Sequence, residues 1–249
     1  MTTPAGAPPA YVRIATEWAE RIDSGELQHG DPLPTREELA EQYGVSKTVI
    51  RDALSLLHQD GYLQTATRRG TRVFRLPRYE LPMYSWESDD RGRDAYEDAV
   101  RAQGGNPGQQ IEVQTITPSA DVANALQLED GQLALARLRI RTIDGIPYCT
   151  ADSYFPYNLV RDSELVNPAN ISRGGRHVLR ELGLEMVRHR DRIHSRRPRA
   201  REITDLGIPS GLPILRHDRI SYTADGTPIR YMVSAFPSDR WEITYEVEK

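Results

Sequence analysis

Apolar residues recur at helical spacing near the start of the chain. Tyr11, Ile14, Ala15, Trp18 and Ile22 fall at positions i, i+3, i+4, i+7 and i+11, a single stripe that predicts an amphipathic helix. The stretch "SGELQHGDPLP" that follows contains two glycines and two prolines, residues that interrupt helices. The pattern therefore predicts one helix followed by an irregular connection.

Two shorter helices are predicted next. Thr35 and Glu38 have the spacing of a capping box, and Gly44 can end that helix in the left-handed conformation. Ser46 can cap the following helix. The inner face of this third helix carries Ile50, Ala53, Leu54 and Leu57. Two helices joined by a glycine turn indicate a helix-turn-helix.

From Gly61 onward, apolar and polar residues tend to alternate, which is typical of strands. "YLQTA" and "TRVFR" predict a short hairpin with "TRRG" at its tip. Beyond residue 108, six alternating segments, two Asp-Gly turns and three short helical patterns are mixed. This mixture predicts an α+β fold with a mainly antiparallel sheet. The two "DG-x-P" hairpins are too little evidence for a tandem repeat, so none is expected.

The domain boundaries follow from the segment between the two patterned regions. Residues 77–94 contain prolines, glycine and acidic residues without a long apolar period, which predicts a linker. Residues 1–76 are then a winged helix-turn-helix domain, and residues 95–249 are an α+β domain that begins with a helix at Ala95–Ala102. A chain of 249 residues is long enough for two such domains.

The charge distribution indicates a polyanionic partner for the first domain. The chain has a net charge of −4, but residues 47–75 carry six cations and two anions. On the third helix Thr48 points outward, with Lys47 and Arg51 on the same flank. Arginine can bind guanine, and the helix N-terminus at Ser46 favours phosphate. We therefore expect double-stranded DNA as the partner, with the arginine-rich hairpin tip as a wing.

These segments resemble the N-terminal domain of the GntR family of bacterial transcription regulators. The motifs that carry the likeness are "SGEL", "GDPLPT", "ELA", "GVS", "IRDAL" and "DGYL", all within residues 11–75. The resemblance implies that the recognition helix and the wing contact DNA. The residues concerned are Ser46, Lys47, Thr48, Arg51, Arg69, Gly70 and Thr71.

Three positions depart from the family pattern. The family usually has Ser-Glu-Arg after Leu-Pro, with the arginine on a phosphate. Here the order is Thr35-Arg36-Glu37, so Thr35 and Arg36 become the candidates for that contact. Lys47 stands where arginine is usual and loses the bidentate fork. Arg68 stands where the wing often has glycine, which adds a cation to the DNA-binding set.

The second domain resembles the UTRA ligand-binding domain of the HutC subfamily, whose fold is like that of chorismate lyase. Segments such as "LARLRIRTIDGIPY", "LRELGLE" and "ILRHDRISYTADGTPI" carry the likeness across most of residues 110–243. The resemblance implies a domain for effector binding and dimerisation, with no cofactor and no metal. In that family an Arg-x-Arg before "DG" helps to bind an anionic effector, which gives this role to Arg139 and Arg141.

Further effector-binding candidates lie on neighbouring strands and at a helix start. They are Asp152, Ser153, Tyr154, Gly174, Gly175, Arg230 and Phe236. The first three lie on the strand after the hairpin turn, and the two glycines place backbone N–H groups at a helix start. The last two replace a glutamate and a tyrosine of the family. Without the resemblance, Arg139 and Arg141 are also compatible with a salt-bridged outer face of a sheet.

Together these patterns predict a dimeric, cytoplasmic repressor that binds a palindromic operator and is released by a small anionic effector. The chain has one cysteine, Cys149, no secretory leader and no apolar run of the ~20 residues that a membrane span needs. The alternative is an enzyme with a chorismate-lyase-like fold that acts on a small carboxylate, although Cys149 has no evident base. A regulator with an all-helical metal-binding sensor is disfavoured by the strand-rich second half.

Overall fold

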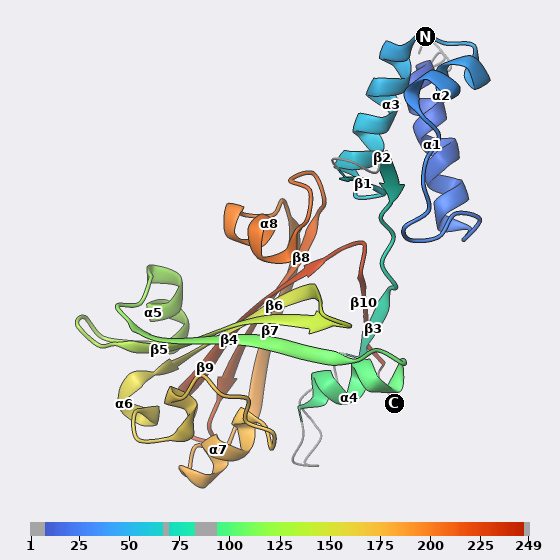
Figure 1. Ribbon diagram of the computed structural model, residues 1–249. Coiled ribbons are helices and arrows are strands. Elements are labelled where there is room, and N and C mark those ends of the chain that lie inside the picture. Colours follow the sequence, from blue (N-terminus) through green and yellow to red (C-terminus); the bar gives the residue numbers. More distant parts are fainter. Residues whose placement is uncertain (1–7, 67–69, 83–93, 247–249) are drawn as a thin grey trace. The chain divides into compact units, whose positions relative to one another are not determined.

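The computed structural model describes residues 8–66, 70–82 and 94–246 (Figure 1). The chain divides into two compact units, of which the first comprises Met1–Pro77 with Ile208–Leu212 and the second comprises Arg78–Gly207 with Pro213–Lys249. Within the described residues, every helix is too short or too polar to cross a lipid bilayer.

The first unit consists of three helices and a hairpin. The helices are α1 (Ala10–Asp23), α2 (Arg36–Tyr43) and α3 (Lys47–Gln59). The antiparallel hairpin is formed by β1 (Leu63–Ala66) and β2 (Gly70–Val73). Apolar side chains of α1 and α3 pack into one core, to which they contribute Ile14, Ala15, Trp18, Ile22, Ile50, Ala53, Leu54 and Leu57. The amphipathic stripes of the sequence are thus the surfaces that the unit buries.

Local signals begin and end α2 and α3 as predicted. The Thr35 hydroxyl accepts a hydrogen bond from the Glu38 N–H at 3.2 Å, and the Glu38 carboxylate accepts the Thr35 N–H at 2.7 Å. Gly44 ends α2 with φ 64°, in the left-handed region. At the start of α3, the Ser46 hydroxyl accepts the Val49 N–H at 3.4 Å. The two helices therefore form the expected helix-turn-helix.

The second unit is built on a six-stranded sheet in the order β4-β5-β6-β9-β8-β7, antiparallel throughout. The strands are β4 (Pro107–Ile116), β5 (Ala134–Ile143), β6 (Ile146–Pro156), β7 (Arg188–Arg196), β8 (Ile214–Tyr222) and β9 (Pro228–Pro237). Asp144 and Gly145 join β5 to β6 with φ 52° and 79°, the conformation that an Asp-Gly hairpin turn requires. The predicted α+β fold with an antiparallel sheet is confirmed.

Helices cover both faces of this sheet (Figure 1). The helices are α4 (Ala95–Ala102), α5 (Ala120–Leu126), α6 (Tyr157–Val160), α7 (Gly175–Glu181) and α8 (Ala200–Leu206), with a 3-10 helix at Glu164–Val166. We name the face covered by α5 and α8 the α8 face, and the face covered by α6 and α7 the α7 face. Side chains alternate along a strand, so odd-numbered residues of β5 and β6 point to the α7 face and even-numbered ones to the α8 face.

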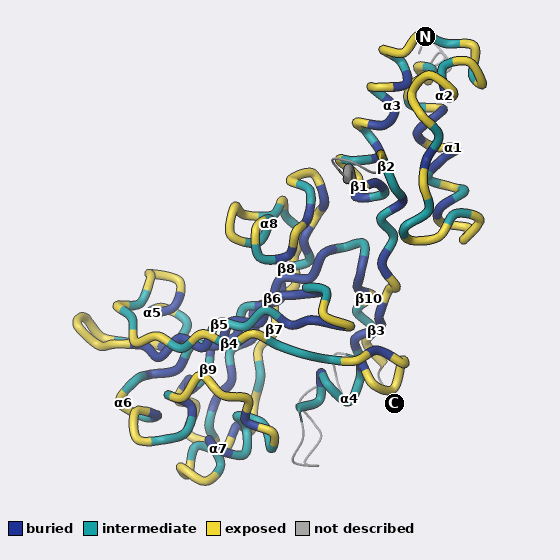
Figure 2. Tube along the Cα trace, in the orientation of Figure 1, coloured by how far each residue is buried: buried dark blue, intermediate teal, exposed yellow. Residues whose placement is uncertain are grey.

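Burial follows this layered arrangement. Leu135 and Phe155 pack against Val178 and Leu179 of α7 on one face. On the other face, Ala134 packs with the apolar side of α5. Figure 2 shows that the central strands are largely buried, whereas β7 is exposed along most of its length. The sheet therefore has a dry centre and one solvated edge strand.

A short parallel pair, β3 (Tyr79–Pro82) and β10 (Trp241–Thr244), corrects the expected linker. The sequence places all of residues 77–94 in that linker, but Tyr79 and Leu81 are buried and Tyr79 packs against Trp241 with ring centroids 6.1 Å apart. An alternation of four residues is too short to recognise, and its partner strand lies at the other end of the chain. Residues 83–93 of the expected linker lie outside the described residues.

The second unit also contains two similar halves. β4, α5, β5 and β6 recur in the same order as β7, α8, β8 and β9. Ala120 and Ala134, which begin α5 and β5, correspond to Ala200 and Ile214 with a shift of 80 residues in both cases. The sheet order reads the same from either edge, so an approximate two-fold axis passes between β6 and β9. The expectation of no repeat is therefore wrong. The repeat is hard to detect in the sequence because the two halves share an order of helices and strands more than they share residue types.

Candidate DNA-contacting surface and effector pocket

The first turns of α3 present polar side chains to solvent. Lys47, Thr48 and Arg51 are exposed, whereas Ile50 and Ala53 behind them are fully buried. The free amides at the start of α3 favour phosphate through their partial positive charge. This is the arrangement that a helix needs to enter a major groove with its N-terminal residues.

Both cations of this surface are paired with carboxylates. Lys47 Nζ lies 2.6 Å from Glu37 Oε1, and the Arg51 guanidinium lies 2.9 Å from Asp52 Oδ1. The hydrogen bond from Lys47 lowers the pKa of the Glu37 carboxyl below its ordinary value. All four side chains are at least 45% exposed, so these ion pairs are weak. Lys47 and Arg51 thus remain available to phosphates and bases.

The two candidates for a phosphate contact at the start of α2, Thr35 and Arg36, differ in their surroundings. The Thr35 side chain is engaged in the capping box with Glu38, so its oxygen has a structural role. Arg36 is exposed, and no described residue forms a hydrogen bond or ion pair with its side chain. Of these two candidates, Arg36 is therefore the better placed to reach a phosphate.

Only part of the expected wing, Gly70 and Thr71, lies within the described residues of the hairpin. Gly70 begins β2 with φ 75°, a conformation that favours glycine, and Thr71 follows it partly buried. Arg68 and Arg69 lie outside the described residues. Two further cations of this segment serve the unit itself. Arg72 donates to the Gly30 carbonyl at 2.6 Å, and Arg75 pairs with Asp23 at 2.8 Å.

We expect Glu37→Gln to strengthen binding to DNA of any sequence. The change frees Lys47 and removes a negative charge beside the phosphates, so affinity for a random duplex should rise about threefold to tenfold. The slope of log affinity against log salt should steepen by about one contact. Fluorescence anisotropy at several salt concentrations measures both quantities. Glu20→Gln on α1 makes the same charge change on another helix. If both variants had an equal effect, the gain in affinity would come from the net charge and not from freeing Lys47.

Three arginines of β5 point to the α7 face, and one of them is neutralised locally. Arg141 is 6% exposed and pairs with Asp94 at 3.0 Å. Its guanidinium also lies 4.2 Å from the centre of the Tyr96 ring, a cation–π contact. Arg141 therefore has a counter-charge of its own and holds the start of α4 against the sheet.

A second arginine of this face, Arg137, has a structural role that the sequence did not indicate. It is fully buried and donates to the backbone carbonyls of Leu165, Asn167 and Ala169 at 2.5, 2.6 and 3.0 Å. A guanidinium that satisfies three loop carbonyls orders the chain above the sheet. These partners lie about thirty residues away, so no local pattern identifies the contact.

The third arginine, Arg139, lacks such partners. Its Nε atom is buried, and no described residue forms a hydrogen bond or ion pair with its side chain. Burial, together with the nearby cations Arg141, Arg230 and Arg137, lowers the pKa of the Arg139 guanidinium to about 9. A cation held in this way has unused capacity for an anion. Arg139 is thus the strongest anion-binding candidate of the second unit.

Two other predicted residues lie on the same face. Ser153 is fully buried, and its hydroxyl accepts hydrogen bonds from Arg230 Nη2 and Nε at 3.1 and 3.3 Å. Arg230 also contacts the Met232 sulfur at 3.3 Å. The structure therefore brings Arg139, Ser153 and Arg230 to one face of the central strands.

The remaining effector candidates are not brought together with them. Asp152 and Tyr154 alternate with Ser153 and point to the α8 face, because neighbouring residues of a strand face opposite ways. Phe236 is fully buried and packs edge-on against Trp241 at 5.5 Å, so it is a core residue. At the start of α7, the Gly174 N–H already donates to the Ile171 carbonyl at 2.8 Å. Of the two glycines, Gly175 is therefore the remaining candidate for binding an anion.

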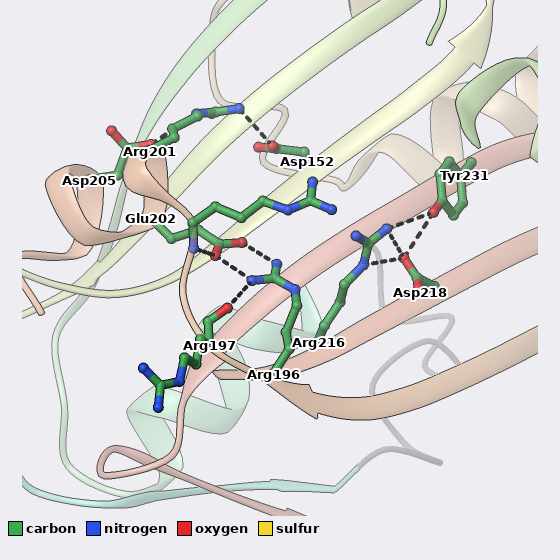
Figure 3. Close-up of polar contacts among 10 residues, drawn as sticks. Asp152, Arg196, Arg197, Arg201, Glu202, Asp205, Arg216, Asp218 and Tyr231 are labelled. Atoms are coloured by element: carbon green, nitrogen blue, oxygen red, sulfur yellow. Dashed lines mark hydrogen bonds and ion pairs between the residues drawn. The ribbon is translucent and has the colours of Figure 1, made fainter. Parts of the chain in front are cut away.

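Several charged groups of the α8 face pair with one another (Figure 3). Arg201 of α8 pairs with Asp152 of β6 at 3.0 Å, and Arg216 pairs with Asp218 at 2.8 Å and contacts Tyr231 at 3.1 Å. A crevice of about 160 Å³ between α8 and the sheet is lined by Arg201, Asp152, Arg216 and Tyr231 among others. The lining of the crevice holds as many carboxylates as guanidiniums, so its charges balance overall.

We expect Arg201→Ala to lower stability in a pH-dependent way. Burial raises the pKa of Asp152, and Arg201 opposes that shift, so the variant leaves a buried carboxylate without its counter-ion. The loss should be about 1 kcal/mol, or a Tm lower by roughly 2–4 °C, at pH 7. It should shrink as the pH falls and Asp152 is protonated in both proteins. Calorimetry at pH 7 and pH 4 measures the difference, with Arg197→Ala as the control for a nearby exposed cation; a loss independent of pH would contradict this account.

The cysteine and the possible metal ligands of the chain show no arrangement for catalysis or metal binding within the described residues. Cys149 is fully buried, and burial raises the pKa of its thiol to about 12, which makes it unreactive. Across the part of the chain that the structure describes, no three His, Cys, Asp or Glu side chains are grouped so as to hold a metal ion.

Comparison with known proteins places both units. The family model described as "Bacterial regulatory proteins, gntR family" matches residues 10–73, and the UTRA domain model matches residues 102–242. The HTH-type transcriptional repressor NagR of Bacillus subtilis is 27% identical over 242 residues, which cover 97% of this chain and 96% of NagR. The HTH-type transcriptional repressor PhnF of Mycolicibacterium smegmatis is 29% identical and covers 96% of this chain and 94% of PhnF.

Solved structures agree with these matches. The crystal structure of PhnF from Mycobacterium smegmatis superposes with a TM-score of 0.59 and 26% identity, covering 94% of this chain and 99% of that one. These relatives are transcriptional regulators, so the enzyme alternative is wrong. The UTRA match alone spans more than half of the chain. This chain therefore belongs to the GntR family of bacterial regulatory proteins, as a DNA-binding transcription regulator with a UTRA domain.

Proposed function

We propose that this regulator is a cytoplasmic, dimeric repressor that binds a palindromic operator and leaves it when a small anion binds the second unit. The observation that carries the proposal is Arg139, a cation of the α7 face whose side chain forms no ion pair or hydrogen bond with a described residue. NagR and PhnF are both named as repressors, which supports repression as the direction of control.

A dimer follows from the small size of the DNA-contacting surface. One copy of α3 offers Lys47, Thr48 and Arg51, too few groups for a specific affinity at physiological salt. Two copies held by their second units would bind two half-sites about one helical turn apart, and linkage would multiply the affinity. An operator of this kind is an imperfect palindrome.

The effector is proposed to bind among Arg139, Ser153 and Arg230. A small anion there would neutralise Arg139 and accept hydrogen bonds from the surrounding donors. If the anion binds one arrangement of the dimer more tightly than another, it shifts the population toward that arrangement. Release follows when the favoured arrangement no longer fits the half-site spacing.

A thermal-shift screen of small anionic metabolites tests this proposal. An effector at a hundredfold excess over its Kd should stabilise the protein by about 2.7 kcal/mol. Each hit is then added to the complex of the full-length protein with an operator selected from a random DNA pool. The proposal requires that at least one hit stabilises the protein and releases the operator. A screen whose hits all stabilise the protein without weakening DNA binding would overturn the release mechanism.

The oligomeric state has its own test. Light scattering coupled to size exclusion should give twice the mass of one chain, and an operator cut to one half-site should bind at least a hundredfold more weakly. A monomer that binds the half-site and the full site equally would contradict the dimer.

A further inference from the structure

The two halves of the second unit place an arginine at equivalent positions on the α7 face. Arg139 of β5 and Arg219 of β8 are separated by the same 80 residues that relate α5 to α8. The edge strands repeat as well, since Ile111 of β4 lies directly opposite Arg139 and Asp191 of β7 lies directly opposite Arg219. Ile111 and Asp191 therefore occupy equivalent places beside the two arginines.

In the second half, the edge strand supplies a carboxylate. Arg219 Nε and Nη2 donate to Asp191 Oδ1 and Oδ2 at 2.6 and 2.8 Å, a side-on bidentate pair. The buried His217 adds a third hydrogen bond, from Nε2 to Oδ1, at 2.8 Å. Burial would raise the pKa of the Asp191 carboxyl, but the hydrogen bonds from His217 and Arg219 hold it below its ordinary value. Arg219 thus has a charged partner within the chain.

In the first half, the equivalent place holds a hydrocarbon. Ile111 cannot accept a hydrogen bond, and no described residue forms an ion pair with Arg139. A cation in a poorly solvated place without a counter-charge is costly. The first half therefore has the arginine of the pair but not the carboxylate.

We propose that the effector is a carboxylate, and that its carboxylate pairs side-on with Arg139 as Asp191 pairs with Arg219. The inference rests on the proposed function, because it names the ligand class of the same site. A planar carboxylate satisfies the two in-plane donors of one guanidinium. A phosphate brings a third oxygen that needs further donors, and the neighbouring Arg230 already donates to the Ser153 hydroxyl and contacts the Met232 sulfur. Arg137, at the position equivalent to His217, already gives its Nη groups to loop carbonyls.

Supplying the carboxylate from the chain itself tests the pairing without any ligand. Ile111→Asp should place a carboxylate beside Arg139, raise the Tm by about 2–4 °C, and make the second unit resemble its ligand-bound state. In the Arg139→Met background the same change should lower the Tm, because the aspartate then has no partner. Ile111→Asn is the matched control for shape and polarity, and circular dichroism verifies that each variant is folded. An equal effect of Ile111→Asp in both backgrounds would overturn the pairing.

Small probes then test the ligand class. Succinate and inorganic phosphate are titrated into the full-length protein and followed by thermal shift. Succinate should stabilise the wild type at concentrations at least tenfold lower than phosphate does, and Ile111→Asp should weaken succinate binding at least tenfold while Ile111→Asn does not. Phosphate that binds more tightly than succinate, or succinate that binds the Ile111→Asp variant unchanged, would overturn the inference.

Operator affinity separates this inference from the proposed function. If the carboxylate pairs with Arg139 by the tests above but Ile111→Asp binds the selected operator as tightly as the wild type, the inference holds and the release mechanism fails. If phosphate alone binds and releases the operator, the release mechanism holds and the carboxylate assignment fails.

Discussion

Replacing Arg139 with methionine is expected to weaken effector binding strongly and, at the same time, to raise the Tm of the ligand-free protein. Methionine keeps the aliphatic stem of the side chain but removes a charge that has no described partner. A hydrogen bond to a charged group is worth about 1.5–3 kcal/mol, so the effector should bind about ten- to a hundredfold more weakly. The gain in ligand-free stability should be about 1 kcal/mol.

The opposite signs of these two effects make the prediction specific. A residue that only supports the fold would lower the Tm when replaced, and a surface cation would change neither quantity. Calorimetry gives the Tm, and titration of the effector identified by the screen gives its Kd. Arg190→Met on the exposed strand β7 makes the same charge change and should alter neither. If Arg139→Met lowers the Tm and leaves the effector Kd unchanged, Arg139 is a structural residue and the site must be sought elsewhere.

Replacing Arg51 with alanine is expected to weaken operator binding by about 1–3 kcal/mol and to relax specificity at one base position. The side chain is 60% exposed on α3, and its present partner Asp52 is a weak competitor for it. Because Arg51 would act on a base rather than on a phosphate alone, binding to random DNA should fall much less than operator binding.

Anisotropy titrations with the selected operator and a random duplex give both affinities. Arg13→Ala on α1 serves as the control, since Arg13 is exposed on another helix of the same unit. A loss that is equal on the two duplexes would assign Arg51 to the phosphate backbone. No loss on either duplex, in a folded protein, would remove α3 from the groove.

The first unit could be predicted almost completely because its signals are local. The capping box at Thr35, the glycine at Gly44 and the cap at Ser46 each act within four residues, and the structure contains all three. The one residue of the α1 stripe that fails is Tyr11, which lies in the first turn of the helix and is 37% exposed. Periodicity identifies a helical face, but it does not say where along the helix the core ends.

For the second unit, the fold class could be predicted from the sequence, but the residues of the effector site could not. Alternation and the Asp-Gly turns indicated an antiparallel sheet, and both are present. The candidates Asp152, Ser153 and Tyr154 are adjacent in sequence. In a strand, adjacency separates side chains onto opposite faces, so only Ser153 shares a face with Arg139.

The sequence by itself determined the family, the helix-turn-helix and the six strands of the main sheet, because caps, turns and periodicity act over a few residues. Only the tertiary structure decided which arginines are already neutralised. Arg141 meets Asp94 and Arg219 meets Asp191, whereas Arg139 faces Ile111. These partners are set by strand register and by contacts between segments far apart in the chain, and electrostatic balance depends on distance in space rather than on separation in sequence.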